Sequence, residues 1–399
     1  MNFIIRVVFF LAFVFALSIQ SSDDAMAQDA ACTTAGAGYA AAYDQCSSTN
    51  PANQASTAVT SSESVQAAVA QTAGLVASRI SGFAASSSAP GQALRPQNHY
   101  KLFALGNGGT VLNSKSENTI RKSKAYEATT GEDSAPDTQI SGLAAGAMKP
   151  KFGIWADAAY SRLIYSKDLE NFDGYIYSGV LGFDYAVQKD LMVGVAGGYE
   201  KVDLDTEFNR GSVDGTGWTV SPYAVYKVTD NYSVDLSGGY SWINYDLERL
   251  DPGDASKITG DQDATRWFVS ANIKGDHWYD NVHLGGRVGI LHAKEDRDSF
   301  TESNLTNTAG ANTNVGQGYL GARLGYLVSL EGGSMEPYVR ALGRYSYDDG
   351  GSGDSSDAVV GLGTAMTFGK FQLGIDGSAV VGRDDTNNFT GRLNARIEF

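Results

Sequence analysis

Cysteine and histidine are scarce in this chain. Its 399 residues contain 2 cysteines and 4 histidines, too few for a metal cluster or for a fold held together by several disulfides. His277 and His283 flank a predicted turn and could form a metal pair, although a structural role for both is the simpler interpretation. No Gly-x-Ser-x-Gly elbow sits at a strand-to-helix turn, and no other catalytic constellation is present. We therefore predict no enzymatic activity, no cofactor and no metal.

Long apolar runs are missing after the first 19 residues. No later run reaches the roughly 18 apolar residues of a spanning helix, so we expect no transmembrane helix in the mature chain. Residues 1–27 have the order of a secretory signal peptide: Arg6, an apolar run over 7–19, and the small-x-small site Ala25-Met26-Ala27. An uncleaved N-terminal anchor is the alternative, but the run is short for that role. The sequence thus predicts export.

The two cysteines both follow the predicted cleavage site. Cys32 does not mark a lipoprotein, because the Asp-Ala-Ala at 29–31 lacks the expected apolar residue. In an oxidising compartment Cys32 and Cys46 are expected to form a disulfide. Residues 28–60 are rich in Ala, Ser, Thr and Gln and offer little to build a core. We interpret them as a short low-complexity segment closed by that disulfide.

Residues 61–88 have the periodicity of a slim helix. Apolar side chains recur at steps of three and four residues, and most other positions are Ala, Ser or Gln. Such a helix fits the surface of a soluble domain or the lumen of a barrel, where bulky charged side chains would not pass. The barrel pattern that follows favours the lumen. The expected luminal residues are Val65, Val69, Val76, Arg79 and Ile80.

Residues 89–150 mix Gly, Ser, Thr and charges and are predicted to be a linker. The whole chain has 47 Gly, 21 Tyr and 17 Phe, which is typical of an all-β protein with tight turns and aromatic girdles. Its formal net charge of -15 argues against nucleic acid as a partner. Acidic residues cluster near two predicted loops, where we expect them to keep the loops solvated, with Ca²⁺ binding as the alternative. These residues are Asp251, Asp254, Asp261, Asp263, Asp348, Asp349, Asp354 and Asp357.

From residue 151 to 399 the hydrophobic period changes to two. In the last strand Leu393, Ala395, Ile397 and Phe399 share one face, while the residues between them, such as Arg392, share the other. Alternate side chains of a paired strand point to opposite faces of its sheet. An apolar face beside a polar one suits a wall between lipid and a wet lumen. The pattern predicts a closed antiparallel transmembrane β-barrel.

Twelve segments show this pattern, an even number as expected for such barrels. Their connections alternate between short turns and long loops, which predicts that both ends of the barrel domain lie on the periplasmic side. Aromatic residues near strand ends are expected at the headgroup level, namely Tyr175, Tyr177, Trp218, Tyr245, Trp278, Tyr279, Tyr345 and Tyr347. The predicted strands are 152–164, 174–187, 190–204, 215–228, 232–246, 264–279, 282–294, 315–330, 335–347, 357–368, 371–382 and 388–399.

Several short motifs in their order resemble the autotransporter β-domain of Gram-negative bacteria. Residues 71–81 resemble the pre-barrel helix of alphaproteobacterial members, and the end at Phe399 resembles the signal read by the barrel-assembly machinery. Phe399, Ile397, Ala395 and Leu393 would carry that signal. The other motifs are GLAAG (142–146), FGIWA (152–156), LGFDY (181–185), GVAGGY (194–199), VSPYA (220–224) and LSGGYSW (236–242).

The resemblance implies a translocator of type V secretion. It implies a twelve-stranded barrel in the outer membrane, with long loops extracellular and a helix through the pore that displays an N-terminal passenger. Its expected partners are outer-membrane lipid, lipopolysaccharide, periplasmic chaperones and the assembly machinery, and the barrel would be monomeric. The passenger would be very short, and residues 61–88 lack the Asn pair at which some members cut theirs loose. A channel or structural barrel without a translocated passenger is the alternative.

Overall fold

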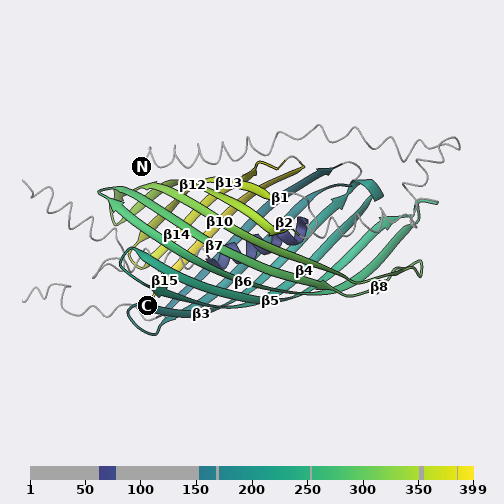
Figure 1. The fold of residues 1–399 in the computed structure, drawn as a ribbon, viewed down its shortest axis with the longest axis horizontal. Coiled ribbons are helices and arrows are strands. Elements are labelled where there is room, and N and C mark those ends of the chain that lie inside the picture. The colour runs from purple at the N-terminus through teal and green to yellow at the C-terminus, as the bar shows by residue number, and fades with distance from the viewer. Residues whose placement is uncertain (1–62, 78–151, 168–169, 252–253, 350–354, 384) are drawn as a thin grey trace, which may run out of the picture.

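A computed structural model of the chain describes residues 63–77 and 152–399, except 168–169, 252–253, 350–354 and 384. Residues 63–77 form one helix, which we call the luminal helix. Almost all the remaining described residues belong to strands (Figure 1). The predicted disulfide between Cys32 and Cys46, the predicted signal peptide and linker, and helix residues Arg79 and Ile80 lie outside the described residues.

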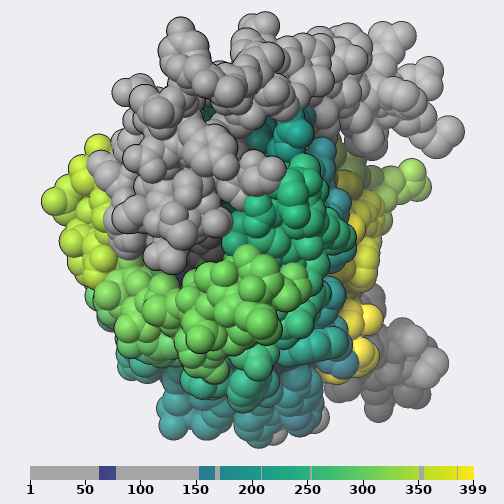
Figure 2. Space-filling view, turned by 90° about the vertical axis from the view of Figure 1, so that its right-hand side faces the viewer, coloured from purple at the N-terminus to yellow at the C-terminus, as the bar shows by residue number. Residues whose placement is uncertain are grey.

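Twelve long antiparallel strands form a closed barrel. Each strand pairs with its neighbours in sequence, and β1 pairs with the last strand, β15, over the register from Gly153↔Glu398 to Tyr165↔Thr386. Figure 2 shows this closure, with the yellow C-terminal strand beside the blue-green first strand. The predicted fold class is confirmed. The long strands are β1 (Phe152–Lys167), β2 (Glu170–Ala186), β3 (Leu191–Thr206), β4 (Gly211–Lys227), β5 (Tyr232–Leu250), β6 (Lys257–Tyr279), β7 (Val282–Arg297), β10 (Ala311–Tyr326), β12 (Gly333–Asp348), β13 (Ser356–Phe368), β14 (Phe371–Val381) and β15 (Thr386–Glu398).

Three minor strands and one short helix complete the sheet connections. β8 (Phe300–Thr301) and β9 (Asn307–Thr308) pair in the connection between β7 and β10. β11 (Val328–Leu330) follows β10 and pairs with the start of β12. A 3-10 turn, η3 (Glu207–Asn209), joins β3 to β4. β11 continues β10 after one residue, so the two count as a single strand of the barrel, and the total is the twelve strands that the sequence predicts.

The two ends of the barrel differ in their connections, as expected. Tight turns at 187–190, 228–231, 280–281, 331–332 and 369–370 form one end, which we call the turn end, and the longer connections form the loop end. The predicted loops were too long, however. β5 and β6 stay paired up to Leu250↔Lys257, where the sequence suggested a loop over 247–263. The apolar alternation stops where the lipid would stop, but main-chain pairing does not need lipid and continues beyond it.

Inner and outer faces separate as the alternation predicts. On β15, Leu393 and Ile397 are exposed on the outer surface, whereas Arg392 lies in the lumen and bonds Asp157. On β5, Leu236 is exposed and Asp235 is buried in the lumen. A lipid-facing wall needs apolar side chains without partners, and a wet lumen accepts charged ones.

Exposed aromatic residues form two belts on the outer surface. Toward the loop end, Tyr199 pairs across strands with Trp218, and Trp218 with Trp242. Toward the turn end lie Tyr226 and Tyr279, both exposed. Trp218 and Tyr226 are eight residues apart on β4, or about 26 Å along the strand and about 20 Å along the axis of a barrel whose strands tilt by ~40°. This span approaches the apolar height of an outer membrane.

Two of the aromatic residues predicted for these belts point inward instead. Tyr245 is buried in the lumen, where its hydroxyl contacts Glu295. Trp278 stacks on the ring of His283 at 4.2 Å and lines a luminal cavity. Their placement near strand ends suggested a headgroup position, but their parity along β5 and β6 decides the face. For these two residues the prediction was wrong.

Candidate functional site

The luminal helix packs by its apolar side chains against three clusters on the barrel wall. Val65 and Val69 are fully buried with Phe268 and Leu291, from β6 and β7. Leu75 and Val76 pack beside Trp155 and other residues of β1–β4. Ala68 lies in a third cluster built by β1–β6. Burying each Val or Leu side chain stabilises the docked helix by about 1.5–3 kcal/mol relative to water.

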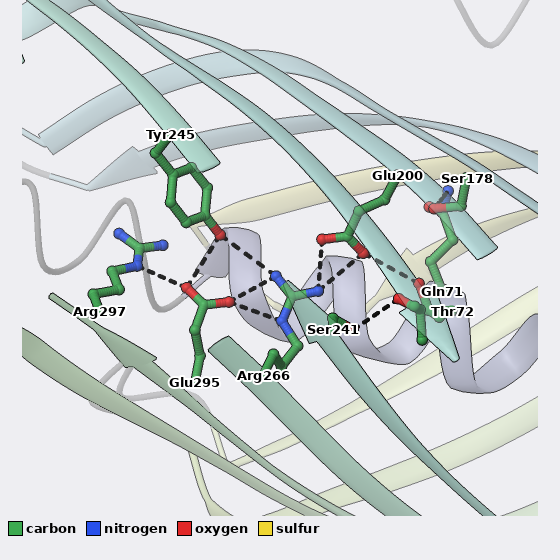
Figure 3. Close-up of polar contacts among 10 residues, drawn as sticks. Gln71, Thr72, Ser178, Glu200, Ser241, Tyr245, Arg266, Glu295 and Arg297 are labelled. Atoms are coloured by element: carbon green, nitrogen blue, oxygen red, sulfur yellow. Dashed lines mark hydrogen bonds and ion pairs between the residues drawn. The ribbon is translucent and has the colours of Figure 1, made fainter. Parts of the chain in front are cut away.

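A buried ion network holds the middle of the helix (Figure 3). Arg266 on β6 donates to Glu200 on β3 at 2.7 Å and to Glu295 on β7 at 2.8 Å. Thr72 of the helix donates to Glu200 at 3.3 Å. Arg297 donates to Glu295 at 2.7 Å, so two arginines balance two carboxylates. Since all four charged side chains are at most 7% exposed, removing any one leaves an uncompensated buried charge.

A second hydrogen-bonded group ties the helix to β1 and β2. Gln71 accepts from Ser161 at 2.6 Å and donates to Ser178 at 3.0 Å. Both serines lie on lumen-facing positions of their strands and are buried. The amide of Gln71 is therefore satisfied on both its oxygen and its nitrogen, which fixes the rotation of the helix about its own axis.

The N-terminal end of the helix is fixed by an arginine that follows β14. Arg383 donates to Glu63 at 2.8 Å and to Gln66 at 2.9 Å. Asp357 on β13 accepts from Arg383 at 2.9 Å and from Arg344 at 2.6 Å, which orients the guanidinium. A carboxylate in the first helical turn also suits the positive end of the helix dipole. The N-terminal end of the helix thus lies at the loop end of the barrel.

Cations of the barrel wall bind the last described residues of the helix. Arg392 on β15 donates to the carbonyl oxygens of Gly74 and Leu75 at 3.3 and 3.4 Å while paired with Asp157. Lys274 on β6 donates to the carbonyl of Ala77 at 2.8 Å. The carbonyl oxygens of a helix point toward its C-terminal end and give that end a partial negative charge, which attracts cations. The wall supplies hydrogen-bond donors to these carbonyls. The contacts at its two ends therefore define the direction in which the helix runs through the barrel.

One stripe of the helix faces open space. Ala67, Ala70, Gln71 and Gly74 are half-buried, whereas all other residues of the helix are buried. This spacing places them on one face. They line a cavity of about 160 Å³ between the helix and the wall of β12–β15. The helix is therefore packed to one side of the lumen.

A comparison with protein families identifies the family of this barrel. A model described as the autotransporter β-domain matches residues 154–383, more than half of the chain. The chain belongs to this family. A comparison with curated proteins gives no match.

Two solved autotransporter structures are similar in fold. The translocator domain of the autotransporter NalP from Neisseria meningitidis matches with a TM-score of 0.55 at 12% identity, over 71% of this chain and 96% of that one. The β-domain of the Bordetella autotransporter BrkA matches with a TM-score of 0.56 at 19% identity, over 62% and 100% of the two chains. At these identities the likeness concerns the fold.

The structure places the sequence-predicted residues of this autotransporter as follows. Val65, Val69 and Val76 are buried in the lumen. Leu393 and Ile397 are exposed on the outer face of β15, with Ala395 half-buried between them, and Phe399, directly after β15, is exposed as well. The wall residues Glu200, Arg266, Lys274 and Arg383 were not singled out from the sequence. For the first three, the sequence did contain a signal: each is a charged residue at a strand position whose alternation with apolar neighbours points it into the lumen.

The candidate histidine pair is not formed. His277 contacts Tyr232 on one side of β6, while His283 lies in the lumen between Asp276 and Glu336, at 3.0 and 2.8 Å. Among the residues that the structure describes, no group of three or more His, Cys, Asp or Glu is placed to hold a metal.

The two acidic groups are only partly in loops. Asp261 and Asp263 lie on β6, and Asp357 binds two arginines in the lumen, so their assignment to loops was wrong. Asp254 does lie in a connection, where hydrogen bonds from Ser256 lower the pKa of its carboxyl group. No described helix has the length and apolarity required to span a membrane.

Proposed function

We propose that this autotransporter anchors and displays its short N-terminal segment on the cell surface. The observation that carries the proposal is the polarity of the luminal helix. Its N-terminal end binds Arg383 at the loop end of the barrel, and its C-terminal end binds Lys274 and Arg392 deeper in the lumen. The chain before residue 63 would then leave through the loop end, and the chain after residue 77 would return to β1 at the turn end.

The proposal includes the location of the protein. Residues 1–27 direct export, the barrel sits in the outer membrane with its loop end outside, and Cys32 and Cys46 close the displayed segment with a disulfide. Outer-membrane lipid and lipopolysaccharide contact the two aromatic belts, and the barrel is a monomer. Chaperones and the assembly machinery recognise the C-terminal strand through Phe399. The role is structural and needs no catalytic group.

An epitope tag inserted after Cys46 tests the display. Intact cells should bind antibody to this tag and lose it on treatment with external protease. A tag between Gly369 and Lys370, in a turn-end connection, is the control and should stay protected until the outer membrane is broken. If the Cys46 tag behaves like the Gly369 control, the chain is a barrel without a translocated passenger.

A further inference from the structure

The open space beside the luminal helix consists of two cavities that meet. The cavity of about 160 Å³ runs along the helix toward the loop end. A second cavity of about 350 Å³ lies below it, toward the turn end. Arg287, Arg340, Leu342 and Arg392 line both cavities. Since a water takes about 30 Å³ of liquid volume, both spaces are wide enough for several waters.

The walls of this space carry an excess of positive charge, although the whole chain is acidic. The described lining of the cavity beside the helix has five arginines, Arg287, Arg340, Arg344, Arg383 and Arg392, and one carboxylate, Glu63; Arg344 and Arg383 also pair with Asp357 behind the lining. At the junction, Arg340 pairs with Asp376 at 3.0 Å and Arg392 with Asp157. The Nε of Arg340 is buried without a hydrogen-bond partner.

Arg287 is the uncompensated cation at the junction. Its guanidinium lies 4.9 Å from the centre of the Tyr319 ring, and no carboxylate of a described residue lies within 4.0 Å of it. Arg340 and Arg392 are close enough to repel it electrostatically, while Asp235, which is paired with Lys274 at 3.0 Å, attracts it from beyond contact distance. Lys274 and Asp235 cancel as a pair, as do Arg340 with Asp376 and Arg392 with Asp157, so the charge of Arg287 remains as one net positive charge where the cavities join. A small anion would compensate that charge.

The helix contributes a smooth side to the same space. Ala67, Ala70 and Gly74 face the cavity, and a Cβ built on Gly74 would meet no atom within 4 Å. Larger side chains on this stripe would fill the cavity. The helix therefore occupies the lumen without sealing it against the wall of β12–β15.

We propose that these two cavities form one path for small inorganic anions beside the docked helix, with Arg287 as the residue that determines its selectivity. Chloride or phosphate would be attracted to the junction, while cations would be repelled from it. This passage needs no movement of the helix, and it does not depend on surface display of the N-terminal segment.

Reversal potentials in a planar bilayer test the path with the purified mature protein. Under a KCl gradient, the wild-type protein should conduct with a reversal potential displaced toward that of chloride. Arg287→Gln should move the reversal potential toward zero, and Arg287→Glu should move it toward that of potassium. Lys201→Gln, which removes one charge from the outer face of β3, is the matched control and should leave the reversal potential unchanged.

A second variant tests the route itself. Ala70→Trp should lower the conductance while the protein still shows the heat-dependent gel mobility of a folded barrel. A closed or cation-selective wild-type protein would overturn the proposal. The proposal would also be overturned if neither Arg287 substitution changed the reversal potential, or if Ala70→Trp left the conductance unchanged. Surface labelling of the Cys46 tag is a separate measurement, so failure of one proposal does not imply failure of the other.

Discussion

Arg383 and Glu63 are 320 residues apart in the sequence, and their side chains form a hydrogen-bonded ion pair at 2.8 Å. The pair joins the first described turn of the luminal helix to the loop end of the barrel. Asp357, which accepts from Arg344 on both of its oxygens, fixes the position of Arg383. The helix can adopt this position only when the barrel has closed around it, because its partners come from strands at both ends of the domain.

Loss of Arg383 should loosen the start of the helix. In Arg383→Gln, the bonds to Glu63 and Asp357 lose their charge, and hydrogen bonds to charged groups contribute about 1.5–3 kcal/mol each. Amide hydrogens of residues 63–70 should then exchange roughly tenfold faster or more, since about 1.4 kcal/mol corresponds to a factor of ten. Arg249→Gln, which breaks the 2.6 Å pair between Arg249 at the end of β5 and Glu302 in the connection between β7 and β10, should leave that exchange unchanged. Equal exchange in Arg383→Gln and wild type would contradict the assigned role.

Arg266 should be the most sensitive position of the lumen. Arg266→Leu leaves Glu200 without its cation and Glu295 with Arg297 alone, and breaking a buried pair in this way costs about 3–5 kcal/mol. The midpoint of guanidinium unfolding in detergent should fall accordingly. Glu200→Gln is the milder comparison, because Arg266 keeps Glu295. An unfolding midpoint equal to that of wild type in Arg266→Leu would show that water replaces the network.

Lys274 and Asp235 should be coupled energetically. Their side chains lie 3.0 Å apart, 3% and 0% exposed, and Lys274 also binds the carbonyl of Ala77. Lys274→Met should destabilise the barrel more than the double variant Lys274→Met/Asp235→Asn, because the second change removes the unpaired carboxylate. A double-mutant cycle of unfolding free energies measures the coupling. Additive effects of the two substitutions would mean that the pair contributes nothing beyond its separate residues.

Gly74→Ala should stabilise the docked helix. A helical glycine costs up to about 1 kcal/mol relative to alanine, and the Cβ at this position would meet no atom within 4 Å. Gly194→Ala is the opposite case, because its Cβ would lie 2.2 Å from the Tyr223 ring. Thermal unfolding should move up for the first variant and down for the second. A lower midpoint for Gly74→Ala would show that the barrel requires the absence of a side chain at this position.

Phe399 should affect assembly more than stability. Its side chain is 56% exposed on the outer face, while its backbone N–H donates to Phe152 at 3.0 Å and would do so with any side chain. Phe399→Ser should therefore reduce the amount of folded barrel in the outer membrane without shifting the unfolding midpoint of the protein that does fold. Ile397→Ser, at the next outward position, should act in the same direction. If both variants reach the outer membrane in the wild-type amount, the assembly machinery does not recognise these residues of the C-terminal strand.

Prediction succeeded where a property repeats locally along the chain. Arg392 and Leu393 are neighbours in sequence, and the period of two was sufficient to place one in the lumen and the other on the lipid side. The same rule should have placed Tyr245 in the lumen, but its closeness to a strand end suggested the headgroup level. The loop boundaries failed for a related reason: residues 247–250 lack the apolar alternation and yet remain paired.

The sequence by itself determined the strands, their even number, the two faces of the wall and the slim helix, because each depends on spacing within about a dozen residues. Only the tertiary structure decided which luminal charges meet. Arg266 finds Glu200 and Glu295, and Arg383 finds Glu63, through the stagger between strands and the closure of β1 on β15. It also decided that no carboxylate in the described part of the chain lies within 4.0 Å of Arg287. Stagger and closure depend on the registers of all the strand pairs together, and these registers cannot be read from the residue pattern of any one strand.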